Sequence, residues 1–199
     1  DPFPLGRHER IGALRGADKL YGREPQLAQL LTACERVAAG GVELWLVSGP
    51  AGIGKSTLVG ELQRLVLARK GRFAVGKFDP LRREQPYAAV LDALQGLVRQ
   101  LLTEPERELA RWRERLRAAG ASALLDAVPP LEQLVGSQPP PESQADKGSL
   151  HDALRAFIVA CASAEQPLVL FLDDLQWADP ASLALIRQLL EAPRPLRLL

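Results

Sequence analysis

The stretch VSGPAGIGKSTLV, residues 47–59, gathers three glycines and a proline in one short loop, followed at once by a lysine and two hydroxyl residues. It matches the template Gly-x-x-x-x-Gly-Lys-Ser at Gly49, Gly54, Lys55 and Ser56. The apolar residues 43–48 before it predict a buried strand, and helical periodicity after Lys55 predicts a helix to about residue 70. A loop between a strand and a helix is the setting of a phosphate-binding loop.

Each residue type in this loop suits the binding of phosphate. Glycines let successive backbone N–H groups point into one concavity, and the following helix N-terminus adds positive potential. We expect Lys55 to contact the β- and γ-phosphates, Ser56 to ligate Mg²⁺ and Thr57 to lie near the α-phosphate. The predicted nucleotide-binding residues of the loop are Gly49, Pro50, Ala51, Gly52, Ile53, Gly54, Lys55, Ser56 and Thr57. A glycine-rich turn that merely opens a helix is the structural alternative.

A second motif, LVLFLDD at residues 168–174, favours the phosphate-binding interpretation. Carboxylates at the C-terminal end of a buried parallel strand emerge where open α/β sheets bind ligands. We expect Asp173 to hold Mg²⁺ together with Ser56, and Asp174 to polarise an attacking water. Lys55, Asp173 and Asp174 are therefore the candidate catalytic residues. Asp174 is shorter than the glutamate usual in fast ATPases of this kind, which predicts slow turnover.

The rest of the chain alternates predicted helices and strands. Helices are expected at residues 24–40, in several pieces over 86–136, at 149–164 and from Pro180, and a strand at 72–79. Uniformly apolar strands alternating with helices predict an α/β three-layer sandwich with a parallel sheet and a helical insertion between the second and third strands.

Shorter local signals predict individual contacts. Ser149 and Asp179 are expected to cap the helices that follow them. Thr103 and Glu106 have capping-box spacing. Two pairs at i,i+3 spacing are expected on one charged helix, Glu108 with Arg111 and Glu114 with Arg117.

Composition excludes several classes of protein. The 199 residues are 47% hydrophobic and 25% charged, with a net charge of +1 and mixed signs, which disfavours direct nucleic-acid binding. No apolar run approaches the roughly 20 residues of a membrane span, and the N-terminus has no signal-peptide core. These features predict a cytoplasmic protein that does not contact a membrane. Cys34 and Cys161 are expected to be buried and reduced. His8 and His151 have no recognisable partner pattern and receive no role.

Three motifs, GPAGIGKST, LVLFLDDLQWADPASL and LYGRE, resemble the AAA-type ATPase modules of the STAND class of signalling NTPases. Such modules occur in bacterial multidomain sensor and serine/threonine kinases and in LuxR-type transcription regulators. The resemblance covers residues 20–199 and implies a partial P-loop ATPase domain, preceded by a linker from a preceding domain at residues 1–19. It implies that Gly22, Arg23 and Glu24 lie near the adenine and ribose. A helix-start signal is the alternative for these three residues.

The resemblance also implies a further strand that starts near Leu196 and lies between the strand before the phosphate loop and the acidic strand. The absence of methionine and the apolar run at the C-terminus indicate an excised piece with its C-terminal strands truncated. Marginal stability and weak hydrolysis are expected on that interpretation. The preference for ATP over GTP depends on the resemblance alone.

The leading hypothesis is a regulatory switch that binds and hydrolyses ATP with Mg²⁺ inside a larger bacterial signalling protein. Its expected partners are ATP or ADP, neighbouring kinase, sensor or DNA-binding domains of the same polypeptide, and further copies in a nucleotide-dependent homo-oligomer. Two alternatives stay open: a scaffold module that binds ATP or ADP without hydrolysis, and a DNA-initiator-type AAA ATPase. A small-molecule kinase is disfavoured by the adjacent acid pair.

Overall fold

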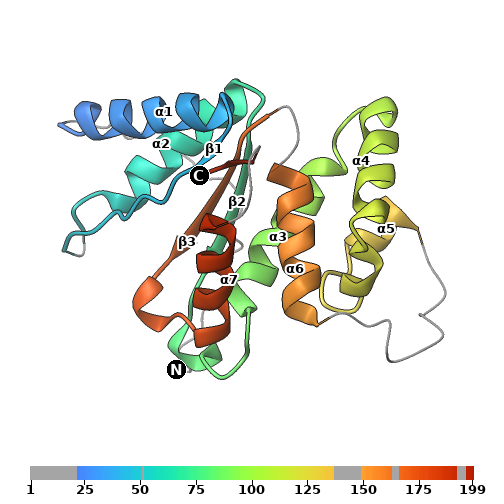
Figure 1. The fold of residues 1–199 in the computed structure, drawn as a ribbon. Coiled ribbons are helices and arrows are strands. Elements are labelled where there is room, and N and C mark those ends of the chain that lie inside the picture. Colours follow the sequence, from blue (N-terminus) through green and yellow to red (C-terminus); the bar gives the residue numbers. More distant parts are fainter. Residues whose placement is uncertain (1–21, 51, 137–148, 163–165, 192–195) are drawn as a thin grey trace, which may run out of the picture.

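The computed structural model describes residues 22–50, 52–136, 149–162, 166–191 and 196–199 (Figure 1). Its strands are β1 (Gly41–Val42), β2 (Arg72–Lys77), β3 (Leu168–Asp173) and β4 (Arg197–Leu198). They form a parallel sheet in the order β1-β4-β3-β2. The parallel sheet is as predicted, and β4 lies between β1 and β3, where the resemblance placed it. The predicted linker, residues 1–19, lies outside the described residues.

Helices cover both faces of this sheet. Those that flank it in the described part of the chain are α1 (Glu24–Ala38), α2 (Lys55–Ala68), α3 (Ala88–Leu101), α6 (Leu150–Ala162) and α7 (Pro180–Leu190). Phe73 and Val169 pack against α1 and α2, whereas the adjacent Ala74 and Leu168 face the core shared with α3, α6 and α7. Neighbouring strand residues point to opposite faces, so the predicted three-layer α/β sandwich is confirmed.

The predicted helical insertion between β2 and β3 is also present. Between α3 and α6 it contains α4 (Glu106–Ala118), the 3-10 turn η2 (Ala121–Leu124) and α5 (Leu131–Val135). Leu97, Leu116, Leu124 and Leu154 are completely buried there and belong to the same core cluster as Leu168 of the sheet. The insertion therefore packs as a continuation of the sheet's core.

Several local predictions are confirmed. Ser149 Oγ accepts from Asp152 N at 3.2 Å, and Asp179 Oδ1 accepts from Ser182 N at 2.8 Å. These bonds satisfy amide groups that a helix leaves free in its first turn. Cys34 and Cys161 are buried free thiols, and burial raises their pKa values to about 11 and about 12. None of the helices in the described segments combines the length and hydrophobicity of a membrane span.

The predicted capping box at Thr103 is wrong. Thr103 Oγ1 donates to Gln100 O at 2.7 Å, at the end of α3, and α4 begins at Glu106 with Pro105 as its N-cap. A residue that precedes proline is disfavoured in helical conformation, so Glu104 cannot open the helix as the capping box requires.

Of the two predicted ion pairs on α4, one is confirmed and one is replaced. Arg111 Nη1 lies 3.1 Å from Glu108 Oε1, as expected. Arg117 Nε instead donates to Val135 O at 2.8 Å. Terminal helix carbonyls lack a partner within the helix, and Arg117 supplies one at the end of α5.

The predicted strand at residues 43–48 is also wrong. Regular pairing stops after Val42, and the last ladder bond runs from Glu43 N to Leu198 O at 3.0 Å. Beyond it no backbone hydrogen bond joins residues 44–48 to another described residue, and Leu44 and Leu46 are 56% and 71% exposed. A strand needs a hydrogen-bonded neighbour, so an apolar sequence alone does not form one here.

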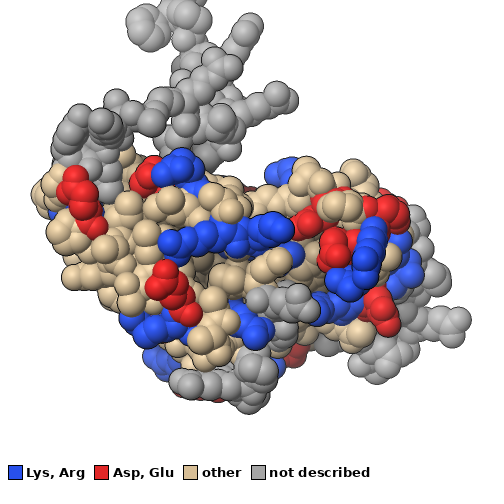
Figure 2. Space-filling model, turned by 90° about the horizontal axis from the view of Figure 1, so that it is seen from above, with Lys and Arg blue, Asp and Glu red and all other residues tan. Residues whose placement is uncertain are grey.

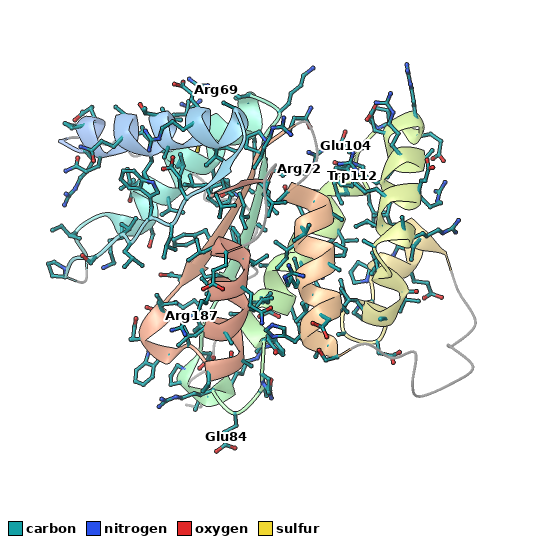
Figure 3. All side chains as sticks on the ribbon, in the orientation of Figure 1. Arg69, Arg72, Glu84, Glu104, Trp112 and Arg187 are labelled. Atoms are coloured by element: carbon teal, nitrogen blue, oxygen red, sulfur yellow. The ribbon has the colours of Figure 1, made fainter. Side chains whose placement is uncertain are left out.

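A buried arginine connects the insertion to the amino-terminal edge of the sheet. The Arg72 guanidinium lies 4.4 Å from the Trp112 ring centroid and 3.6 Å from Glu104 Oε1, and Figure 3 shows the three side chains together beside α4. Burial lowers the pKa of Arg72, and its Nε and Nη1 have no hydrogen-bond partner among the described residues. The face around this edge mixes basic and acidic side chains (Figure 2).

Helix α3 packs closely on the outer strand β2. Gln100 Nε2 donates to Phe73 O at 2.6 Å, and a Cβ placed on Gly76 would lie 2.0 Å from Ala89 O. The first contact occupies one backbone carbonyl of β2, and the second shows that the backbones of the two elements lie close together. Gly76 is therefore the position that lets the start of α3 approach β2.

We predict that Gly76→Ala lowers the free energy of unfolding by about 1–3 kcal/mol or more, because backbone must move to admit the methyl group. Gly96→Ala is the matched control on α3, since a Cβ there meets nothing within 4 Å. That control should stabilise the protein by about 0.5–1 kcal/mol through helix propensity. Urea unfolding of both variants checks this, and equal effects would contradict the close packing at Gly76.

Candidate functional site

The backbone of the loop at residues 49–54 curls through conformations that favour glycine. Gly52 and Gly54 have φ values of +79° and +88°, which side-chain-bearing L-residues rarely adopt. Gly54 is the N-cap of α2, which has no side-chain cap and no acidic residue in its first turn. The first amides of a helix have no partner within it, and they attract anions together with the helix dipole. Ala51 lies outside the described residues.

Lys55 places its charge inside the curve of this loop. Its Nζ donates to Gly49 O at 2.8 Å and to Pro50 O at 3.1 Å. The ammonium group is therefore positioned by the loop itself. An oxygen of a bound phosphate would compete with these two carbonyls for the same donors.

A cavity of about 850 Å³ brings the two sequence motifs together. Gly49, Lys55 and Ser56 line it from the loop, and Asp173 and Asp174 line it from the end of β3. In Figure 1 the segment before α2 lies to the left of the sheet, and the turn after β3 lies below it. The cavity has the size of a small-molecule site.

The oxygen donors in this cavity fit Mg²⁺. Ser56 offers a hydroxyl and Asp173 a carboxylate, which are hard ligands of the type that Mg²⁺ prefers. Among the described residues no group of three or more His, Cys, Asp or Glu could hold a metal ion. Mg²⁺ usually binds one or two protein oxygens together with substrate phosphates, and Ser56 and Asp173 match that number and type of ligand.

Both oxygens of Asp174 are engaged by neighbours. Gln176 Nε2 donates to Oδ1 at 3.0 Å, and Lys77 Nζ lies 3.2 Å from Oδ2. These hydrogen bonds, first from Gln176 and then from Lys77, lower the pKa of Asp174. Asp174 has a left-handed φ of +54°, and its amide donates to Asp173 Oδ1 at 2.9 Å. The acid pair is thus ordered by contacts from β2 and from the turn that follows β3.

A smaller cavity of about 230 Å³ adjoins the first and is lined by α1, the segment before the loop and the start of α2. Arg23 lines it, and its Nη2 donates to Ile53 O at 3.2 Å. Ile53 and Gly54 also line it. Gly22, Glu24, Pro50, Gly52 and Thr57 are exposed and line neither cavity.

Sequence reasoning missed the contacts of two residues, Lys77 and His151. Lys77 comes beside the acid pair only through the register of β2 with β3. His151, to which no role was assigned, has two partners: its Nδ1 lies 2.8 Å from Tyr87 Oη, and its Nε2 lies 2.9 Å from Gln188 Oε1. No sequence signal joins residues so far apart in the chain. His8 lies outside the described residues.

We predict that Lys77→Met raises the pKa of Asp174 toward its ordinary value of 3.8, because a hydrogen bond to the ionised carboxylate is lost. Folding lowers this pKa, so the contact stabilises the folded protein at pH values above the ordinary pKa of Asp174. That contribution is lost as the pH falls through the lowered pKa. Unfolding of the variant should therefore depend less on acid.

Carboxyl NMR titration measures this pKa directly. Lys70→Met is the matched control, because it removes an exposed lysine that precedes the other end of the same strand, β2. An unchanged pKa in Lys77→Met, or the same shift in both variants, would contradict the pairing.

Comparison with known proteins identifies a family to which the chain is similar. The family model described as an AAA ATPase domain matches residues 19–199. The hybrid signal transduction histidine kinase G of Dictyostelium discoideum is 36% identical over 197 residues, an alignment that covers 96% of this chain and 6% of that protein. The chain thus spans a small part of that relative's length. No solved structure matches the chain. With the parallel sheet, the loop before α2 and a family match over residues 19–199, the chain belongs to the AAA ATPase domain family.

Proposed function

We propose that this chain is an ATP-binding and ATP-hydrolysing module that works with Mg²⁺ as a nucleotide-dependent switch in a larger signalling protein. The observation that carries the proposal is the cavity lined together by Lys55, Ser56, Asp173 and Asp174. One positive charge, one hydroxyl and two carboxylates around a glycine loop form the set that phosphoryl transfer to water requires.

The proposed roles follow from the position of each group. Lys55 exchanges its bonds with Gly49 O and Pro50 O for phosphate oxygens, and the amides at the start of α2 bind further oxygens. Ser56 and Asp173 would hold Mg²⁺, which supplies positive charge at the phosphates. Asp174 orients the attacking water and accepts its proton. The contacts with Gln176 and Lys77 favour the ionised form of Asp174, which is the form that can accept a proton.

A signalling role is supported by the relative, which is by its name a hybrid signal transduction histidine kinase. Membership of the STAND class, contacts with neighbouring kinase, sensor or DNA-binding domains and a nucleotide-dependent homo-oligomer are parts of the same proposal. A switch of this kind needs ATP and ADP to differ in their contacts with the protein. A nucleotide that binds two conformations of the protein equally well does not change their relative populations.

The first test is calorimetric titration of the chain with ATP and with ADP in millimolar Mg²⁺, beside Lys55→Ala. We predict that the variant binds ATP about tenfold more weakly or worse, because the phosphates lose a charge-assisted contact. Lys70→Ala, a change of an exposed lysine outside both cavities, should bind like the unchanged chain. Equal affinity of Lys55→Ala and the unchanged chain would overturn the proposal.

A scaffold that binds nucleotide without hydrolysis is a second candidate, favoured by the engagement of both Asp174 oxygens with Gln176 and Lys77. Asp174→Asn separates the two. On the switch proposal we predict unchanged ATP binding and loss of single-turnover phosphate release, because the amide cannot accept the proton. The control is Asp126→Asn, an exposed aspartate of the insertion. Phosphate release at the same rate in all three proteins would leave Asp174 without a catalytic role.

A further inference from the structure

The backbone of Asp174 holds the side chain of the residue before it. Asp174 N donates to Asp173 Oδ1 at 2.9 Å. The main chain of Asp173 is held as well, because Phe78 N, just after β2, donates to Asp173 O at 3.1 Å. Among the described residues, no other hydrogen bond or ion pair engages the Asp173 carboxylate. Asp173 therefore lines the cavity with Oδ1 already bonded and Oδ2 available.

Asp174 itself has a backbone conformation that few residue types adopt. Its φ and ψ are +54° and 45°, in the left-handed region, and among the described non-glycine residues only Lys70 and Tyr87 share a positive φ. Glycine enters this region freely, and asparagine and aspartate enter it more readily than most other residues. A β-branched residue rarely adopts it. The residue type at position 174 therefore decides how well this conformation is kept.

The chain is anchored on both sides of the peptide group that joins Asp173 to Asp174. Before it, Asp173 is the last residue of β3 and pairs with Lys77 of β2. After it, the 3-10 turn η4 (Leu175–Trp177) is closed by Trp177 N, which donates to Asp174 O at 2.9 Å. A planar peptide group between two fixed segments adapts by rotating as a unit. A change of residue 174 to negative φ therefore turns its N–H away from the Asp173 carboxylate.

We infer that the left-handed backbone at residue 174 positions the proposed Mg²⁺ ligand, because its amide occupies Oδ1 of Asp173 and leaves Oδ2 for the metal. This inference rests on the proposed function, since it needs a nucleotide and Mg²⁺ beside Ser56 and Asp173. Carboxylates that bind metals are themselves held by hydrogen bonds, and the loss of such a partner typically costs 10- to 100-fold in metal affinity. Residue 174 then has two separable parts: a backbone that positions Asp173 and a side chain that orients water.

The test changes the backbone preference and the side chain of residue 174 independently. Asp174→Asn and Asp174→Gly lose the carboxylate but tolerate the left-handed backbone, whereas Asp174→Val loses the carboxylate and disfavours that backbone. Calorimetry gives the ATP affinity in millimolar Mg²⁺ and in excess EDTA, and the ratio of the two is the contribution of the metal. We predict that asparagine and glycine keep this ratio, and that valine reduces it about tenfold or more with no change in EDTA.

Lys70→Val is the matched control for backbone strain. Lys70 has a φ of +62°, is exposed and lines neither cavity, so valine there meets the same conformational demand away from the site. This variant should lose stability in urea unfolding and keep the affinity ratio. If Lys70→Val lowers the ratio as much as Asp174→Val does, the effect comes from the fold and the inference is overturned.

A double-mutant cycle shows whether the backbone of residue 174 acts through Asp173. Asp173→Ala removes the ligand, so adding Asp174→Val to it should reduce the ratio no further. A full additional loss in the double variant would contradict the inference. If circular dichroism shows that Asp174→Val does not fold, Asp174→Ala replaces it, because alanine also disfavours the left-handed region and is not branched. Its ratio should be lower than that of Asp174→Gly, and equal ratios would overturn the inference.

The outcomes separate this inference from the proposed function. If Lys55→Ala weakens ATP binding while Asp174→Val and Asp174→Asn have equal ratios, the phosphate site stands and the positioning role is wrong. If the unchanged chain binds ATP equally well in Mg²⁺ and in EDTA, the metal contributes nothing and the inference fails, although a loss in Lys55→Ala still supports the phosphate site. If Lys55→Ala changes nothing, the proposed function itself fails.

Discussion

The parallel ladder between β2 and β3 is the interaction on which the functional edge depends. It pairs six residues on each strand, from Arg72 with Leu168 to Lys77 with Asp173. Because both strands run in the same direction, their carboxyl ends finish at one edge, and this brings Lys77 beside the acid pair. A slip of one residue would send every side chain to the opposite face. Both cores and the ordered acid pair therefore depend on one register.

The two ends of the paired strands have different roles, one in the candidate site and the other in packing. At the carboxyl end the chain leaves charged and polar groups in open cavities. At the amino end it buries Arg72 against Trp112 and packs the insertion on the sheet. A buried guanidinium with unpaired N–H groups is weak evidence for stability. Its stacking on Trp112 instead gives α4 a defined place beside the strand.

Local sequence signals predicted the parts of the fold that local physics decides. The glycine loop and the caps at Ser149 and Asp179 each depend on residues within a few positions of one another. Residues 43–48 were misassigned because a strand requires a partner from elsewhere in the chain. The Thr103 error had a local cause that the sequence did show, namely Pro105 one step after Glu104. The contacts of Lys77 and His151 depend on register and packing, which no spacing in the sequence encodes.

The left-handed backbone conformation at residue 174 favours aspartate over glutamate, the longer acid that is usual at this position in fast ATPases. With φ at +54° and ψ at 45°, this position favours residues whose short polar side chain can bond nearby groups. Aspartate and asparagine meet that condition, and glutamate does so less well. The backbone conformation of this turn therefore limits the length of the acidic side chain, in addition to any requirement of the reaction. Any redesign toward a longer carboxylate has to reshape the turn before it can change the reach of the side chain.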